Sequence, residues 1–459
     1  MSLPEDTIVA ISTPPGRGGI GIVRLSGPQS LSIATSLLDL TKPLTPTNAR
    51  FTHVLDDTGY TLDEAIVTFF QAPNSYTSED VVEIAAHSAP VLLDHLLRTA
   101  IKNGARLAQP GEFTQRAFLS GRLDLTQAEA VNDLISAQTL HQAKLAAAQL
   151  GGSIAKVIAP IKQDLLTLIA ALEAGVDFAE DDLDLLPQPE IVARIHQLCS
   201  RLEALAKTYN YGRIVREGIR LAIIGQPNAG KSSLFNRLLE RDRAIVTAQP
   251  GTTRDPIAET LNLAGIPITL TDTAGLREIA HHPETEAERE GIARSHTTMA
   301  EADLVLHVVD ASTLTRAGDG TPTLLPEDIA TQIKLQGRPS LLLLNKCDLS
   351  QISLDGYTTL HTSATTGEGL TELKQAIVDA LAAQPPLDSA LVTNLRQAEA
   401  LNTAIEALSA AERASENSTP HEFLLLDLHQ TLQALDDLTG VSTSESILQL
   451  IFSTFCIGK

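Results

Sequence analysis

The sequence predicts a multidomain protein of mixed α/β and α+β class, in which an α/β domain is inserted into a discontinuous all-helical domain. Two observations lead to this prediction. The chain has 459 residues, too many for one hydrophobic core, and about 150 residues per domain suggests about three domains. The pattern also changes along the chain, from short β-like runs to helical runs, then to alternating strands and helices, and back to helical runs.

The first 120 residues favour an α+β domain. Short β-like runs (TIVAIS, IGIVRLSG and EAIVTFF) are separated by Gly, Pro and Asn, and the helical stretch VLLDHLLRTAIKNG follows them. Gly16, Gly18 and Gly21 fit the dinucleotide-binding pattern G-x-G-x-x-G. That pattern requires a helix directly after it, whereas IGIVRLSG is a strand-like run. We therefore expect a hairpin loop here.

The helical regions lie on both sides of the α/β stretch. From Leu125 to about Tyr209 apolar residues recur at spacings of three and four, and the same helical periodicity returns after Pro386. The acidic segment GVDFAEDDLDLLPQP interrupts the first region and is expected to be a solvated connection. An insertion of this kind is accommodated because domain termini tend to lie close together. The predicted division is 1–120 (N-terminal domain), 121–217 and 384–459 (the two helical parts) and 218–383 (the α/β domain).

Composition indicates a cytoplasmic protein with no membrane segment. No apolar run approaches the ~20 residues that span a bilayer, and the acidic N-terminus does not resemble a signal peptide. The three cysteines have neither metal-ligand nor disulfide-framework spacing, which indicates a reducing compartment. The net charge of −22 works against non-specific binding to nucleic acid. If the protein acts on RNA, a partner is expected to supply much of the positive surface.

A nucleotide-binding motif opens the α/β stretch. The strand RLAIIG runs into GQPNAGKS at 225–232, a full match to G-x-x-x-x-G-K-S between a strand and a helix. In such a P-loop, successive backbone N–H groups face the phosphates at a helix N-terminus. The lysine reaches the β- and γ-phosphate oxygens, and the serine hydroxyl is a ligand of Mg²⁺. The predicted contacts are Asn228, Ala229, Gly230, Lys231, Ser232 and Ser233.

Four further motifs follow in the order that a Ras-like G domain requires. The threonines of PGTTRD are expected to close over the γ-phosphate and add a hydroxyl to Mg²⁺. The predicted β-hairpin ETLNLAGIPITLTDTAG ends in DTAG, whose aspartate holds the metal through water and whose glycine senses the γ-phosphate. The residues concerned are Thr252, Thr253, Asp272, Thr273, Ala274 and Gly275.

The last two motifs concern the base. The strand SLLLLNKCD supplies Asn345, Lys346 and Asp348, and HTSATTGEGL supplies Ser363 and Ala364, the usual backbone contact to the guanine oxygen. The Asp348 carboxylate can accept two hydrogen bonds, from N1 and the exocyclic amine of guanine. Adenine presents the wrong pattern of donors, so these residues favour a GTPase over an ATPase.

One position departs from the Ras pattern. Ras-type enzymes orient the attacking water with a glutamine directly after the DxxG glycine. Here that position is Leu276, which cannot polarise water. We therefore expect other groups to organise hydrolysis.

Several segments together resemble the MnmE (TrmE) family of tRNA-modification GTPases. They are DTIVAISTPPGRGGIGIVRLSG, YTSEDVVEIAAHSAP, GEFTQRAFLSGRLDLTQAEAV, GQPNAGKSSL, GTTRD, DTAGLRE and the terminal FCIGK. The resemblance covers the whole chain in order. The blocks outside the G domain make it specific, since the G motifs alone fit many GTPases.

This resemblance implies a homodimer formed through an N-terminal domain similar to tetrahydrofolate-binding domains. It also implies an FAD-containing partner of the MnmG (GidA) type. Together such proteins add an aminomethyl or carboxymethylaminomethyl group to carbon 5 of the wobble uridine of certain tRNAs. A 5-formyl- or methylene-tetrahydrofolate supplies the one-carbon unit. Besides GTP and Mg²⁺ the family uses K⁺, which stands in for an arginine finger when two G domains dimerise.

The resemblance also implies roles for individual residues. Glu288, in a charged segment that would otherwise be expected to be solvated, matches the acid that orients the hydrolytic water. Arg122 stands where relatives have lysine, so a planar guanidinium with several N–H donors replaces a compact ammonium. The matched sets are Asn228, Thr247, Gln249 and Thr252 for K⁺, Ser232 and Thr253 for Mg²⁺, and Arg24, Glu83, Arg122 and Lys459 for folate, with Cys456 as the FCIGK thiol.

The alternative from another class is a ribosome-assembly or regulatory GTPase that acts as a binding switch. The N-terminal block and the FCIGK tail favour tRNA modification, because a pure switch needs neither. The residues leave open which tRNAs are modified, whether glycine or ammonium is incorporated, and how the chemistry is divided with the flavin partner.

Overall fold

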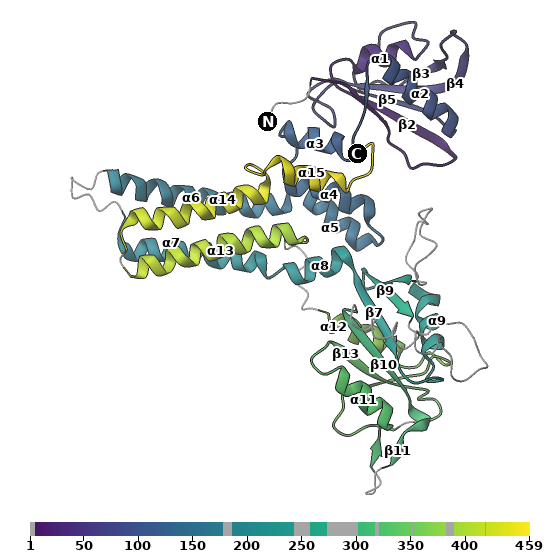
Figure 1. Ribbon diagram of the computed structural model, residues 1–459, viewed down its shortest axis with the longest axis vertical. Helices are drawn as coiled ribbons and strands as arrows, with labels where there is room; N and C mark the ends of the chain where they lie inside the picture. The colour runs from purple at the N-terminus through teal and green to yellow at the C-terminus, as the bar shows by residue number, and fades with distance from the viewer. Residues whose placement is uncertain are drawn as a thin grey trace. The chain divides into compact units, whose positions relative to one another are not determined.

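The computed structural model describes residues 5–177, 186–242, 258–272, 302–316, 321–350, 352–381, 390–417 and 419–459 (Figure 1). The chain forms two compact units, and each combines segments that are far apart in the sequence. Unit 1 contains residues 1–132, 148–199 and 400–459, and unit 2 contains residues 133–147 and 200–399. Within the described residues, no helix is long and apolar enough to cross a membrane.

A six-stranded sheet forms the N-terminal part of unit 1. Its strands lie in the order β3-β4-β5-β2-β1-β6. Their apolar side chains alternate, so that Val23, Val67 and Ile84 lie buried on one face against helix α2, whose Leu93 and Leu96 are also buried. The elements are β1 (Ile8–Ile11), β2 (Gly18–Ser26), α1 (Ser30–Ser36), β3 (Arg50–Leu55), β4 (Thr61–Phe70), β5 (Val81–Ser88), α2 (Pro90–Lys102) and β6 (Arg106–Leu107).

The glycine-rich segment at the N-terminus is a hairpin connection, as the sequence predicted. β1 and β2 pair antiparallel, with Ile8 opposite Ser26. Strand β2 begins at Gly18, so no helix follows the glycines. A Cβ at Gly21 would lie 2.5 Å from the Leu93 side chain, so a larger residue here would require the Leu93 side chain to shift where α2 packs on β2.

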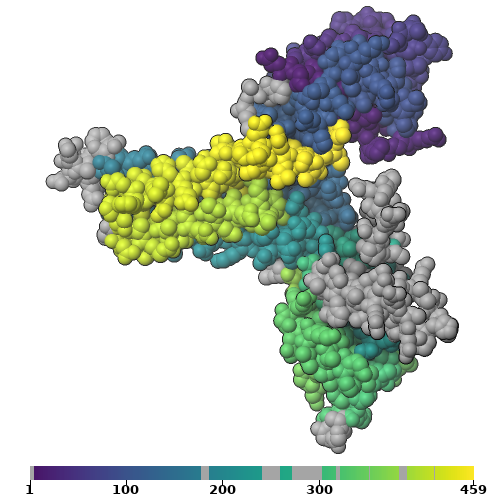
Figure 2. Space-filling view, in the orientation of Figure 1, coloured from purple at the N-terminus to yellow at the C-terminus, as the bar shows by residue number. Residues whose placement is uncertain are grey.

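Helices from both sides of the α/β stretch pack together within unit 1. α6 (Ser153–Asp177) lies beside α14 (His421–Thr439), and the two helices are adjacent in both the ribbon and the space-filling view (Figures 1 and 2). Side-chain bonds from Gln188 to Ser415 and from His196 to Glu412 join α7 (Gln188–Ala206) to α13 (Leu395–Glu416). Residues 178–185, within the acidic connection, lie outside the described residues.

The last helix returns to the first helices of the chain. α15 (Glu445–Ser453) contributes Leu448 and Phe452 to a core shared with α3 (Glu112–Leu119) and α4 (Leu125–Ser136). A Cβ at Gly111, directly before α3, would lie 2.6 Å from the Phe452 carbonyl oxygen. This close approach brings the C-terminal segment against the N-terminal part of unit 1.

Unit 2 is built around a second six-stranded sheet, of the order β14-β13-β10-β7-β9-β8, parallel except for β8. β10 is buried along nearly its whole length, as expected for a central parallel strand. The predicted hairpin is confirmed as β8 and β9. The elements are α5 (Leu140–Leu150), α8 (Tyr209–Glu217), β7 (Ile219–Ile224), α9 (Lys231–Asp242), β8 (Ala258–Leu263), β9 (Ile266–Asp272), β10 (Leu304–Asp310), α11 (Pro326–Lys334), β13 (Ser340–Asn345), β14 (Thr359–Thr362) and α12 (Leu370–Asp379), with a small β11–β12 ribbon (Thr315–Arg316, Pro322–Thr323).

Candidate functional site

The P-loop connects β7 to α9 and adopts a conformation that only certain residues allow. Gly225, Asn228 and Gly230 have φ values of 148°, 62° and 91°. A Cβ at Gly225 would lie 2.0 Å from the Val308 carbonyl oxygen, and one at Gly230 would lie 2.1 Å from Asn345 Nδ2. Both glycines are therefore favoured by close packing, of Gly225 on a backbone carbonyl and of Gly230 on a buried side chain, as well as by their positive φ.

The P-loop lysine is held over its own loop. Lys231 Nζ donates to the carbonyl oxygens of Gly225 (3.0 Å) and Gln226 (2.8 Å). Ser232 and Ser233 follow it in the first turn of α9 and are exposed. The positive end of a helix, an ammonium and an exposed hydroxyl thus converge at this end of α9, and together they suit a phosphate with its Mg²⁺.

Asn345 links the P-loop to the loop after β14. Its Nδ2 donates to the Ala229 carbonyl oxygen (2.8 Å), and its Oδ1 accepts from the backbone N–H of Ala364 (3.2 Å). Asn345 is almost completely buried, so its two hydrogen bonds join the two loops inside the protein. The predicted phosphate and base segments therefore share one anchoring side chain.

The other residues predicted to contact the base have different environments. Asp348 is exposed and free to meet a ligand from solvent. Ser363 is buried and caps its own turn, because its Oγ accepts from the N–H of Thr366 (3.2 Å). Lys346 has a φ of 63°, and its Nζ donates to Asp310 Oδ2 at 2.6 Å.

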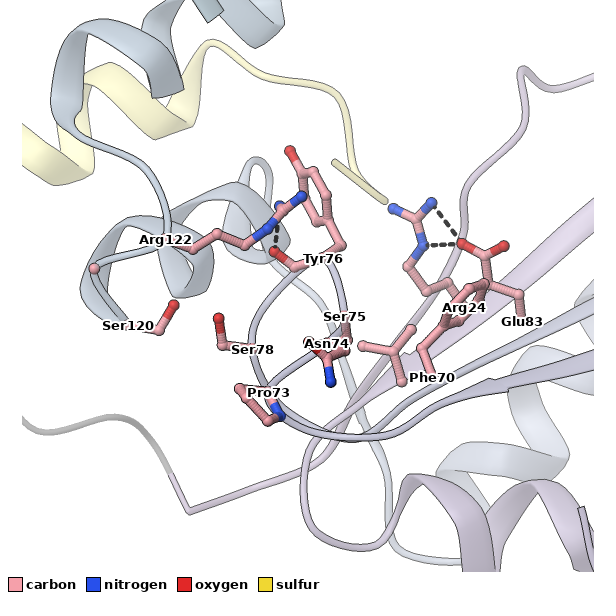
Figure 3. A pocket seen from close by; sticks show the side chains of 12 residues that line it. Arg24, Phe70, Pro73, Asn74, Ser75, Tyr76, Ser78, Glu83, Ser120 and Arg122 are labelled. Carbon is pink, nitrogen blue, oxygen red and sulfur yellow. Dashed lines mark hydrogen bonds and ion pairs between the residues drawn. The ribbon is translucent and has the colours of Figure 1, made fainter. Parts of the chain in front are cut away.

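A cavity of about 690 Å³ lies in unit 1, within the size range of small-molecule sites. Figure 3 shows its lining side chains. Arg24 of β2 and Glu83 of β5 are opposite each other in the sheet, and Arg24 Nη2 and Nε lie 2.8 and 2.9 Å from Glu83 Oε1. Arg122 reaches the same cavity from the segment after α3. The cavity is lined by Arg24, Phe70, Pro73, Asn74, Ser75, Tyr76, Ser78, Val81, Glu83, Ser120, Gly121 and Arg122.

Tyr76 lies between the two arginines. Its ring centre is 5.5 Å from the Arg24 guanidinium carbon and 5.0 Å from that of Arg122, which are cation–π distances. Arg122 Nη1 also donates to the Tyr76 carbonyl oxygen (2.7 Å), and the phenol shares a hydrogen bond with Thr114 (2.9 Å). The ring and the backbone of Tyr76 thus orient both arginines of the cavity.

A buried arginine supports the loop that carries Tyr76. Arg116 is 1% exposed and pairs with Glu79 (3.1 Å), Glu112 (3.0 Å) and Asp6 (2.7 Å). Burial raises the pKa of the Glu112 carboxyl, but hydrogen bonds from Arg106, the Gln109 N–H and Arg116 outweigh burial and hold that pKa below its usual value. The charged network joins α3 to the loop on which Glu79 lies.

The C-terminal tail lies against these elements. Arg24 Nη1 donates to the Gly458 carbonyl oxygen (3.4 Å), and the N–H of Phe113 donates to the Lys459 carbonyl oxygen (3.1 Å). The N–H of Gly111 donates to the Cys456 carbonyl oxygen (3.4 Å), and Cys456 itself is exposed. Of the residues predicted for the folate site, Arg24, Glu83 and Arg122 therefore line the cavity. Lys459 and Cys456 do not line it, but they lie in the tail that contacts Arg24.

Two family models match the chain: "GTP-binding protein TrmE N-terminus" over residues 7–122 and "MnmE helical domain" over residues 125–456. The chain is 49% identical over 463 residues to the tRNA modification GTPase MnmE of Koribacter versatilis, with 99% of each chain covered. It is 41% identical over 460 residues to that of Aquifex aeolicus, covering 99% of this chain and 100% of that protein. The chain belongs to the MnmE family of tRNA modification GTPases. Membership of this GTPase family implies a P-loop protein that binds GTP and Mg²⁺.

Several predicted MnmE site residues lie outside the described residues. Asp272 ends β9, and its backbone pairs with Ile223, two residues before the P-loop begins. This places the start of the DTAG segment one strand away from the P-loop. The predicted residues that lie outside are Thr247, Gln249, Thr252, Thr253, Thr273, Ala274, Gly275 and Glu288.

Sequence reasoning missed three residues that shape these sites in this MnmE-family chain. Tyr76 and Arg116 lie in blocks that resemble the family, but an aromatic or an arginine in such a block has no distinguishing pattern. Asp310 had a usable signal, because an acidic residue at the carboxyl end of a parallel strand lies at the edge where such sheets bind ligands.

Proposed function

We propose that this protein hydrolyses GTP in a K⁺-dependent way and takes part in modifying the wobble uridine of certain tRNAs. With an FAD-containing partner of the MnmG (GidA) type, it adds an aminomethyl or carboxymethylaminomethyl group to carbon 5 of that base. The observation that carries the proposal is the match to proteins named tRNA modification GTPase over 99% of the chain. A regulatory switch would need only the G domain.

Mass spectrometry of tRNA tests this function. In cells that lack the protein, wobble uridines with an aminomethyl-type group at carbon 5 should disappear and return when the gene is restored. Unchanged wobble nucleosides would contradict the proposal and favour a switch GTPase. We propose the cytoplasm as its location, and we propose that the flavin partner supplies positive surface for tRNA, because this chain has a net charge of −22.

We propose that the four parts of the chain divide this work. Residues 1–120 bind folate and form the dimer, 218–383 bind GTP, and 121–217 and 384–459 form the helical domain with the FCIGK tail. For the homodimer, the support is a row of apolar side chains on the face of the first sheet opposite α2. Phe51 (60% exposed) pairs with Ile66 (51% exposed), Ile66 with Ala85, and Ala85 with Ile22.

A one-carbon tetrahydrofolate (5-formyl or methylene) is the proposed ligand of the cavity in unit 1. Folate has a pterin, which requires an acceptor such as Glu83, and an acidic tail, which requires cations such as Arg24, Arg122 or Lys459. The cavity, of about 690 Å³, offers Glu83, Arg24 and Arg122. Folate would supply the one-carbon unit, and the exposed Cys456 of the FCIGK tail is the candidate thiol for that chemistry.

The proposed Mg²⁺ ligands are Ser232 and Thr253, and the proposed K⁺ ligands are Asn228, Thr247, Gln249 and Thr252. Among these, Asn228 is exposed in the P-loop. Leu276 supports the need for K⁺, because the Ras glutamine is missing and another source of charge stabilisation is required.

GTP hydrolysis is expected to be at least about tenfold faster in K⁺ than in Na⁺ at matched ionic strength, because a bound cation offsets charge in the transition state. Asn228→Ala should lose this stimulation, whereas Asn236→Ala, an exposed asparagine on α9, should retain it. The measurement is steady-state phosphate release. Equal wild-type rates in the two salts would rule out the K⁺ assignment.

We propose that Glu288 orients the attacking water. Glu288→Ala should lower kcat by about 100-fold or more while GTP affinity stays nearly unchanged, because the residue acts only on the reacting water. Glu284→Ala, in the same acidic segment, is the control and should hydrolyse GTP normally. Single-turnover hydrolysis and nucleotide titration separate the two quantities. Normal turnover by Glu288→Ala would remove this residue from the mechanism.

A further inference from the structure

An aspartate outside the five G motifs lies directly beside the guanine-specificity motif. Asp310 is the last residue of β10, and in the parallel pairing of β10 with β13 it is opposite Asn345, the first residue of NKCD. The two strands end together at the carboxyl edge of the sheet, where parallel sheets bind their ligands. Asp310 is therefore placed to act on the residue that follows Asn345.

That residue, Lys346, leaves the strand in a conformation that L-residues seldom adopt. Its φ of 63° turns the chain at the end of β13. Its Nζ lies 2.6 Å from Asp310 Oδ2, a short charge-assisted hydrogen bond. The side chains are 32% and 12% exposed, so the pair is partly shielded from solvent and is stronger than an ordinary surface ion pair.

The Asp310 carboxylate is itself fixed in orientation. Its Oδ1 accepts from the backbone N–H (2.9 Å) and the hydroxyl (2.6 Å) of Ser312, which leaves Oδ2 for the lysine. Burial raises the pKa of Asp310, but hydrogen bonds from Lys346 and Ser312 outweigh burial and hold the pKa below its usual value. The carboxylate is therefore charged at neutral pH and present before any nucleotide binds.

We infer that Asp310 is a positioning residue for GTP: it holds the Lys346 ammonium so that the lysine stem is ordered at the guanine site in advance. Lysine has four flexible side-chain bonds, and a ligand that must order such a side chain loses affinity. The Lys346 side chain is fixed at one end by the backbone turn and at the other by Asp310, so GTP does not lose affinity by ordering it. Its methylene groups are then in place to contact the base. The inference rests on the proposed role of Lys346 in GTP binding.

A double-mutant cycle on the full-length protein tests this inference. The variants are Asp310→Asn, Lys346→Met and the double variant. Asparagine keeps a side-chain oxygen that can accept from the N–H and hydroxyl of Ser312. It removes the negative charge that faces the Lys346 ammonium. The matched control is Asp303→Asn, directly before the start of the same strand, where the carboxylate accepts from the backbone N–H of Arg220 (2.9 Å). Affinity is measured with a fluorescent GDP and GTP pair.

We expect Asp310→Asn to raise the Kd and the KM for GTP about three- to tenfold, with kcat changed less than twofold, since only ordering before binding is lost. Lys346→Met should raise the Kd further, and adding Asp310→Asn to it should have little additional effect. The GTP affinity of Asp303→Asn should match the wild type, and a cooperative thermal unfolding transition should show that Asp310→Asn is folded.

Three results would overturn the inference. If the effects of the two single variants multiply in the double variant, Asp310 acts on something other than Lys346. If Lys346→Met weakens binding but Asp310→Asn does not, the lysine binds the base without help from Asp310, and the proposed function stands. If Lys346→Met leaves GTP affinity unchanged, the assigned base site itself fails and the inference fails with it.

Discussion

Asp348→Asn is expected to convert this GTPase into one that prefers XTP. The carboxylate accepts from N1 and the exocyclic amine of guanine, and an amide in its place removes one acceptor and adds a donor. Xanthine has an oxygen where guanine has the amine, so it complements the amide. Two hydrogen bonds to a charged group contribute about 1.5–3 kcal/mol each, so GTP affinity should fall by about two to four orders of magnitude.

The measurement is competition of GTP and XTP for a fluorescent guanine nucleotide. Asp348 is exposed, so its replacement should leave the fold intact, which thermal unfolding can check. Asp355→Asn is the matched control, because Asp355 is an exposed aspartate in the same α/β domain. A variant Asp348→Asn that still prefers GTP to XTP would show that guanine is read by other groups.

Removal of the last four residues is expected to abolish folate binding and tRNA modification but to leave GTP hydrolysis largely intact. The tail supplies the Gly458 carbonyl oxygen that Arg24 contacts and the Lys459 carbonyl oxygen that accepts from Phe113. Without it, one arginine of the cavity and the start of α3 lose partners. Loss of two hydrogen bonds of about 1.5 kcal/mol each predicts at least about a 100-fold weaker folate complex.

Isothermal titration with a reduced folate measures the loss, and phosphate release shows whether the G domain is unaffected. Lys459→Ala keeps the backbone of the tail and removes only the ammonium, so it separates the proposed cation contact of Lys459 from the backbone contacts of the tail. If the truncated protein binds folate with full affinity, the tail does not build the site. If the truncated protein loses both folate binding and GTP hydrolysis, the tail supports the fold as a whole.

Much of the nucleotide site could be predicted because its chemistry depends on short spacings. The P-loop of 225–232 requires glycines at the first and sixth of its eight residues, and the structure places it between β7 and α9 as expected. The hairpin of β8 and β9 was equally local, since two alternating runs are joined by a short turn. Helical periodicity and the return of the same texture predicted the split helical domain.

The cavity required more than spacing. Arg24 and Glu83 were matched through the family resemblance, and only the sheet register shows that they face each other across β2 and β5. The sequence offers no direct sign of this, because strand pairing depends on which apolar faces are buried together rather than on residue type.

The sequence by itself determined the elements, the order of the G motifs and the membership of the family, because each depends on residues close together in the chain. The tertiary structure alone decided three things: the position of Tyr76 between two arginines, the hold of Asp310 on Lys346, and the docking of the tail. The Arg24–Gly458 contact joins residues 434 positions apart. A contact of that range is selected by packing of the whole unit, and the free energy that favours it is distributed over many residues that have no pattern of their own.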